Sequence, residues 1–317
     1  MFKNAIEEDN PKKFWQSFPF PLLIQLGHPL LAIYEIDRVL NDCKKIDEEA
    51  FFKYHKGNPY YWLGFSYFLL KDYQSASFYM DAAVREDINR VPVNYPSPAT
   101  NFIELRGEPS DQAGKELVEL AELTLNDLVN KYNQFIKSNN ENQEYSVELV
   151  RKYFLTRATK PEFPKLQSLA TTFISYILEH ESRYSQLQLV RNPSSKEPFL
   201  LHLFKGCLLF ESLLKENPRV PQITPRQTLG CALQNLYQFL DIKPDINTST
   251  DHFQNVIDLI GRYDDSLNIA FEVTSKTRNT IGHSIGWVVD LNQNDYQQLF
   301  EIISNCCLHV IFRLYKD

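Results

Sequence analysis

Three residues near the end of the chain have side chains suited to chemistry at a phosphate group: Arg278, Asn279 and His283, in the sequence Arg-Asn-Thr-Ile-Gly-His. Histidine has an unperturbed pKa of about 6.5, closest to neutral pH among side chains, so His283 suits proton transfer. Arginine keeps its charge, and its planar fork of donors matches phosphate oxygens, so Arg278 suits stabilisation of developing negative charge. Asn279 can donate a hydrogen bond to phosphate or hold the local chain.

Two further residues are candidates for supporting roles. Gly282 precedes His283, and glycine permits a sharp turn, so we expect the chain to bend there and aim His283 back towards Arg278. Glu211 falls on the apolar stripe of a predicted helix over 199–216, where a carboxylate is costly unless it is paired. It either meets a cation of the motif, most simply Arg278, or lies at the edge of the stripe and reaches water.

Helices must position these residues, because apolar side chains recur at three- and four-residue spacing along most of the chain. Ten glycines in 317 residues are few against a usual share of about 7%, which argues against a sheet-rich architecture. The sequence therefore predicts an all-α protein. The predicted helices that surround the motif, together with one long earlier helix, cover residues 111–137, 165–189, 196–216, 225–241, 250–262, 264–278 and 295–315.

A segment that begins at Asn58, NPYYWLGFSYFLLKDYQSASFYMDAAVRED, resembles a single tetratricopeptide unit. Gly64 and Ala76 are small residues at the positions where the two helices of such a unit cross closely. One unit cannot bury its faces alone, so neighbouring helices must complete the stack. The resemblance implies a groove that docks a peptide or protein partner; a hairpin that merely packs is the alternative. Residues 86–107 contain several prolines and no helical period, and we expect a long loop there.

The Arg-Asn-x-x-x-His pattern ends an amphipathic helix and lies one helix before the C-terminus, and in this it resembles the motif of HEPN domains. The resemblance spans about residues 164–317. It implies a metal-independent endoribonuclease with catalytic Arg278, His283 and Asn279, which cleaves RNA by attack of the 2′-OH. It also implies that two motifs meet across a homodimer, which makes chemical sense because one arginine and one histidine supply only half of an acid–base pair.

The family resemblance places such a protein in a toxin–antitoxin, antiviral defence or RNA-processing setting. In the HEPN subfamily partnered with nucleotidyltransferase antitoxins, a tyrosine commonly follows two residues after the histidine. Ile285 occupies that position, so control by tyrosine modification is not expected. Two alternatives stay open. The C-terminal part could be a HEPN-fold adaptor without catalysis, or the tetratricopeptide-like part could be the functional end as a protein-interaction module.

We expect two domains, a tetratricopeptide-like docking or regulatory region over 1–145 and a HEPN-like helical bundle over 146–317. No phosphate-binding glycine loop and no metal-ligand spacing occurs, so neither a cofactor nor a metal is expected. The net charge of −7 does not favour general coating of nucleic acid. No apolar signal or membrane-spanning run is present, so we expect a cytoplasmic protein. The cysteines, among them Cys207 and Cys231, are expected to be reduced and buried.

Overall fold

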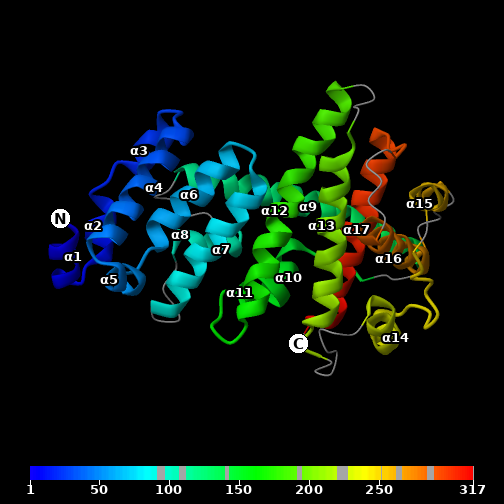
Figure 1. The fold of residues 1–317 in the computed structure, drawn as a ribbon. Coiled ribbons are helices and arrows are strands. Elements are labelled where there is room, and N and C mark those ends of the chain that lie inside the picture. Colours follow the sequence, from blue (N-terminus) through cyan, green and yellow to red (C-terminus); the bar gives the residue numbers. More distant parts are fainter. Residues whose placement is uncertain are drawn as a thin grey trace. The chain divides into compact units, whose positions relative to one another are not determined.

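The chain folds into helices throughout the part that the structure, a computed structural model, describes. The described residues are 1–90, 97–106, 112–139, 143–190, 195–219, 228–250, 252–261, 266–283 and 289–316. Within these ranges no strand occurs, so the protein is all-α, as the helical periodicity predicts (Figure 1). None of the described helices is both long enough and apolar enough to cross a membrane.

The chain divides into two compact units, which we call the N-terminal and C-terminal units. The N-terminal unit comprises Met1–Glu119 and Ala158–Thr171, and the C-terminal unit comprises Leu120–Arg157 and Thr172–Asp317. The predicted domain boundary between residues 145 and 146 therefore lies inside the C-terminal unit. The division depends on contacts between segments that are distant in sequence, and such contacts cannot be predicted from the composition of a local stretch.

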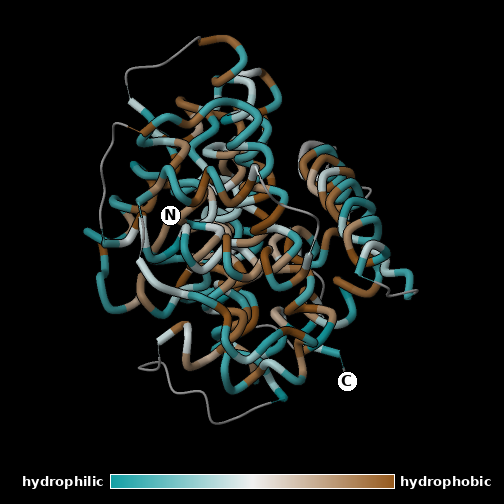
Figure 2. Tube along the Cα trace, turned by 90° about the vertical axis from the view of Figure 1, so that its right-hand side faces the viewer, coloured by the Kyte–Doolittle hydropathy of each residue, from teal (hydrophilic) through white to brown (hydrophobic). Residues whose placement is uncertain are grey.

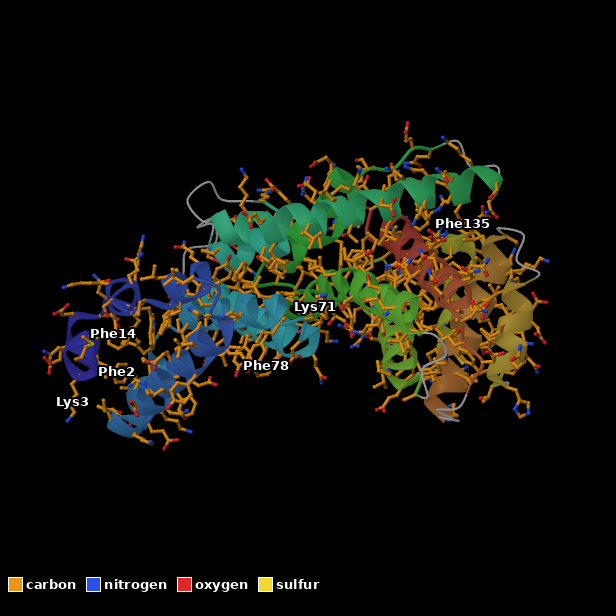
Figure 3. All side chains as sticks on the ribbon, turned by 90° about the horizontal axis from the view of Figure 1, so that it is seen from above. Phe2, Lys3, Phe14, Lys71, Phe78 and Phe135 are labelled. Carbon is orange, nitrogen blue, oxygen red and sulfur yellow. The ribbon has the colours of Figure 1, made fainter. Side chains whose placement is uncertain are left out.

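Short helices and one longer hairpin make up most of the N-terminal unit. The helices are α1 (Phe2–Glu8), α2 (Pro11–Gln16), α3 (Phe20–Gln25), α4 (Pro29–Ile46), α5 (Glu48–Lys53), α6 (Gly57–Leu69), α7 (Tyr73–Arg90) and α8 (Pro98–Ile103). Aromatic residues fill the core at its N-terminal end, where the rings of Phe2 and Phe14 lie 5.6 Å apart (Figure 3). The ring of Tyr54 packs edge-on against both.

Helices α6 and α7 form the hairpin that resembles a tetratricopeptide unit. A Cβ atom added to Gly64 would lie 2.9 Å from Cγ of Met80 and 3.2 Å from the carbonyl oxygen of Ala76. No side chain fits at this crossing, so the prediction that Gly64 and Ala76 mark a close approach of the two helices is confirmed. Helices α3, α4 and α8 also contact α6, so neighbouring elements cover the hairpin as one unit alone cannot.

The expected loop over residues 86–107 is wrong in part. Helix α7 continues to Arg90, and α8 begins at Pro98. Pro98 occupies the first turn of α8, where a missing N–H costs nothing, and Ser97 and Thr100 cap the helix reciprocally. Pro98 thus begins a helix where the sequence pattern predicts a loop. Residues 91–96 lie outside the described part of the chain.

Longer helices build the C-terminal unit, and α9 (Gln112–Ser138) and α12 (Pro164–Leu189) contribute residues to both units. The remaining elements are α10 (Val147–Val150), the π-helical η1 (Arg151–Leu155), α11 (Thr156–Ala158), α13 (Glu197–Lys215), α14 (Leu229–Leu240), α15 (Phe253–Ile260), α16 (Leu267–His283) and α17 (Gln293–Leu314). These bounds confirm the predicted C-terminal helices to within a few residues, except for the end of α16.

Helix α17 is the centre of the C-terminal unit. It contacts α13, α14, α15 and α16, and every side chain from Ile302 to Phe312 is buried. Polar side chains of α17 such as Ser304, Asn305 and His309 are therefore buried together with its apolar ones. Hydrophobic and hydrophilic residues alternate along the Cα trace (Figure 2). Cys207, Cys306 and Cys307 are buried as expected, but Cys231 is exposed. It lies on the face of α14 opposite the buried Leu236, so the expectation for Cys231 is wrong.

Candidate functional site

The predicted motif lies on one continuous helix, because α16 runs through Gly282 and ends at His283. Residues five apart on an α-helix point about 140° away from each other around the axis. Arg278 and His283 therefore diverge, and the structure shows no contact between these two described side chains. Asn279 and His283, four residues apart, share one face of α16. The expectation of a bend at Gly282 that aims His283 back towards Arg278 is wrong.

Gly282 instead allows α16 to pack closely on α13. A Cβ atom at this position would lie 3.3 Å from Cε2 of Phe204, closer than most side-chain contacts. The backbone of Gly282 is helical, and no positive φ angle makes glycine necessary there. Gly282 is thus part of α16 and lies close to the ring of Phe204, and the chain does not turn at this residue.

Glu211 anchors the arginine of the motif. Nε of Arg278 donates a hydrogen bond to Oε2 of Glu211 over 2.7 Å, which confirms the predicted contact. The other carboxylate oxygen, Oε1, accepts a hydrogen bond from Nζ of Lys215 at 2.6 Å. Glu211 is only 7% exposed, so the alternative in which it reaches water at the stripe edge is excluded. Two cations compensate the burial of this carboxylate.

Asn279 is tied to the chain that precedes α15. Its Oδ1 accepts a hydrogen bond from Nη1 of Arg278 over 3.0 Å, and its Nδ2 donates to the carbonyl oxygen of Thr248. A guanidinium has five N–H donors, and these contacts use two of those on Arg278. The Arg278 side chain is 26% exposed, so its remaining donors can reach an external anion.

Charge and accessibility differ among the neighbouring groups that could react. His283 is exposed at the end of α16, where an imidazole can exchange protons with solvent or substrate. Cys207 lies one turn before Glu211 on α13, and burial raises the pKa of its thiol well above the ordinary value, with the Arg278 charge opposing the rise. A buried neutral thiol is inert, so Cys207 is not a nucleophile for this site.

Sequence reasoning found Arg278, Asn279, His283 and Glu211 but missed two contacts. Lys215 follows Glu211 by four residues on one helix, a spacing that predicts an ion pair and could have been used. Thr248 precedes Asn279 by 31 residues, and no pattern in the sequence pairs them.

The position of Ile285 lies outside the described residues, which leave a gap between His283 and residue 289. Among the described residues, no group of three or more His, Cys, Asp or Glu side chains could hold a metal ion. A comparison of the chain with protein-family models, curated proteins and solved structures gives no match.

Proposed function

We propose that the protein is a metal-independent endoribonuclease of HEPN type, which cleaves RNA by attack of the 2′-OH at a site formed across a homodimer. The observation that carries this proposal is the setting of Arg278. A buried carboxylate fixes its Nε and Asn279 holds its Nη1, while the side chain as a whole stays 26% exposed. Such an arrangement orients a permanent positive charge for the phosphorane before substrate arrives, which is the condition for electrostatic catalysis. The exposed His283 would transfer the proton.

The divergence of Arg278 and His283 on α16 supports a site made by two chains. Within one chain the two side chains leave α16 in directions about 140° apart. A second copy of the chain could supply the missing side chain if the two copies paired through the outer face of α13. Leu201 and Leu208 on this face are 45% and 40% exposed. These leucines are seven residues apart and flank Phe204, which contacts Gly282 of the motif. We call Leu201, Phe204 and Leu208 the α13 ridge.

A non-catalytic HEPN-fold adaptor is the second candidate, and one observation favours it. The contacts of Arg278 with Glu211 and of Asn279 with Thr248 join α13, α16 and the segment before α15. Arg278 and Asn279 would make the same contacts if they stabilised the fold and took no part in catalysis. In either case the N-terminal unit would dock a protein partner or regulate the nuclease, through the helices around the α6–α7 hairpin.

The test is cleavage of a labelled single-stranded RNA by the purified full-length protein. We expect cleavage that persists in EDTA, leaves 2′,3′-cyclic phosphate ends, and is lost in His283→Ala. The matched control is His28→Ala, because His28 is also an exposed histidine and lies in the N-terminal unit. Strict dependence on Mg²⁺ would contradict the mechanism. The adaptor would be favoured if all variants kept their fold and cleaved RNA at the same rate, or if none of them cleaved it.

A further inference from the structure

A groove of about 500 Å³ opens on the N-terminal unit, away from the motif of α16 in sequence and within one compact unit. Its lining comes from α5, α6 and α7 and consists of Phe52, Tyr60, Phe78, Asp81, Ala82, Arg85, Glu86 and Asn89. Two of the aromatic side chains are strongly exposed, Phe52 at 60% and Phe78 at 67%. Phe78 projects from α7 (Figure 3). Exposed phenylalanines on the lining of a concavity mark a surface suited to a ligand.

Further aromatic rings continue from the groove across α6 and α7. The ring centroid of Tyr79 lies 5.1 Å from that of Phe78 and 6.2 Å from that of Tyr60. Tyr67 stacks on Tyr79 with the centroids 5.6 Å apart and the planes nearly parallel. Aromatic faces carry negative potential, so a continuous set of such rings attracts cations as well as apolar groups. We call the groove and this row of tyrosines the aromatic surface.

A carboxylate without an ion-pair or hydrogen-bond partner among the described residues lies on α4, the helix that contacts α6 and so neighbours the helix that carries Tyr67. Asp37 of α4 is half-buried, and its carboxylate forms no ion pair and no hydrogen bond with any residue that the structure describes. Burial raises the pKa of Asp37 above its ordinary value. Burial also raises the pKa of Tyr67 and of Tyr79, and the Asp37 charge adds to both shifts. Asp37 is thus a negative charge on a helix next to the aromatic surface, and no cation of the described residues pairs with it.

The other charges around the groove are largely compensated from within the chain. Glu86 accepts hydrogen bonds from the backbone N–H of Lys56 at 3.0 Å and pairs with its Nζ at 3.3 Å. Asp81 pairs with Arg85 at 3.1 Å and accepts from Gln167 and Ser168. Arg85 is the cation among the lining residues, and its side chain is 58% exposed. The aromatic faces and Asp37 therefore leave a net attraction for positive charge.

Resting on the docking role proposed for the N-terminal unit, we infer that the aromatic surface binds a partner protein through a peptide segment that carries lysine or arginine side chains. A cationic head group would pair with Asp37 and lie over the tyrosine row, while the groove between Phe52 and Phe78 takes an apolar side chain of the same segment. The groove volume exceeds that of a lone ammonium group, and the surface extends over several helices, which suits an extended peptide.

The experiment measures fluorescence anisotropy of two labelled peptides titrated with the full-length protein. One peptide alternates arginine with leucine, and the other carries citrulline in place of every arginine, which keeps the shape and removes the charge. We expect the arginine peptide to bind at least tenfold more tightly. We expect Asp37→Asn and Phe78→Ala each to weaken it about two- to fivefold, and Arg85→Ala to tighten it.

Matched controls separate this site from general attraction to an acidic protein. Glu162→Gln removes one exposed charge from the same unit, and Leu123→Ala removes an apolar side chain that is 68% exposed on α9; both should leave the affinity unchanged. Equal binding of the two peptides would overturn recognition of a cation but leave the docking role intact. Binding of neither peptide, or equal loss in Glu162→Gln and Asp37→Asn, would overturn the inference. RNA cleavage, measured separately, tests the nuclease.

Discussion

At the scale of single residues, Glu211 anchors Arg278, whose side chain remains 26% exposed. The carboxylate is buried among apolar residues of α13, so its negative charge must be compensated. Arg278 binds one of its two oxygens and Lys215 binds the other. Nε of Arg278 pairs with Glu211 and Nη1 pairs with Asn279, while the Arg278 side chain stays 26% exposed. In the proposed nuclease the same contact would both stabilise the fold and orient a cation for a phosphate, and the two roles can be separated by measurement.

Replacing Arg278 by alanine should lower the free energy of unfolding by about 1–3 kcal/mol, because a buried carboxylate loses a charged hydrogen bond. The loss should stay below the 3–5 kcal/mol or so expected for a fully broken buried pair, since Lys215 remains. Urea denaturation measures it. Arg85→Ala, which removes an exposed arginine from a surface ion pair, should change stability by under about 0.5 kcal/mol. A similar small change in Arg278→Ala would contradict the anchoring role.

If Arg278 and His283 act in one transition state, their effects on RNA cleavage should not add. We expect Arg278→Ala to slow cleavage about 100- to 1,000-fold and His283→Ala about 100- to 10,000-fold. The double variant should then be little slower than the worse single variant. Single-turnover cleavage rates, taken at a temperature where all four proteins are folded, provide the measurement. Multiplied effects in the double variant would mean that the residues work in separate steps.

At the scale of elements, the crossing of α13 and α16 positions the candidate site. Phe204 and Gly282 bring the two helices together near the end of α16, and Glu211 and Arg278 join them about one to two turns away. Because α16 stays helical through Gly282, the directions of its side chains are fixed by the helix period. In the proposed dimer another chain would complete the site through the α13 ridge, whose Phe204 lies next to Gly282.

Substitution of Leu208 by aspartate should therefore weaken the homodimer. A charge placed in an apolar interface loses water without gaining a partner, so we expect dissociation at micromolar concentrations where the wild type is dimeric. Light scattering measures the mass, and Leu123→Asp on α9 is the matched control for an exposed leucine. A wild-type monomer with intact RNA cleavage would contradict the two-chain site.

At the scale of the whole molecule, buried histidines link the stability of the C-terminal unit to pH. His202 bonds to the carbonyl oxygen of Tyr176 and to the hydroxyl of Tyr296. His309 bonds to the carbonyl oxygen of Leu240 and to the hydroxyl of Tyr132. Burial lowers the pKa of each imidazole to about 3. Both rings are therefore neutral in the folded protein at neutral pH.

The free energy of unfolding should fall as the pH falls from 7.5 to 5.5. In the unfolded chain these histidines bind protons near their ordinary pKa of about 6.5, whereas the folded chain keeps them neutral until near pH 3. Their stabilising contribution is complete above about pH 6.5 and declines below it, by about 3 kcal/mol over this interval for the two residues together. Urea denaturation across the interval tests it. His28→Ala, at an exposed position, should show the same decline, and a flat profile would contradict the burial of His202 and His309.

The sequence alone predicted the helical class and the helices of the C-terminal part, because periodic apolar residues and scarce glycine constrain local structure directly. It also predicted two long-range features, the close crossing at Gly64 and Ala76 and the pairing of Glu211 with Arg278. Both follow from rules with a large energetic penalty behind them. A Cβ atom does not fit where two backbones meet, and a carboxylate on an apolar stripe must find a cation.

Only the tertiary structure decided the rest. Gly282 is compatible with both a turn and a helix, and in the folded chain it lies in α16 next to the ring of Phe204 on α13. Pro98 can break a helix or begin one, and the cap formed by Ser97 and Thr100 selects the second. The bond from Asn279 to Thr248 and the aromatic surface beside Asp37 depend on helices that meet in space. Sequence spacing constrains neighbours within one helix, whereas contacts between helices are fixed by packing of the complete chain.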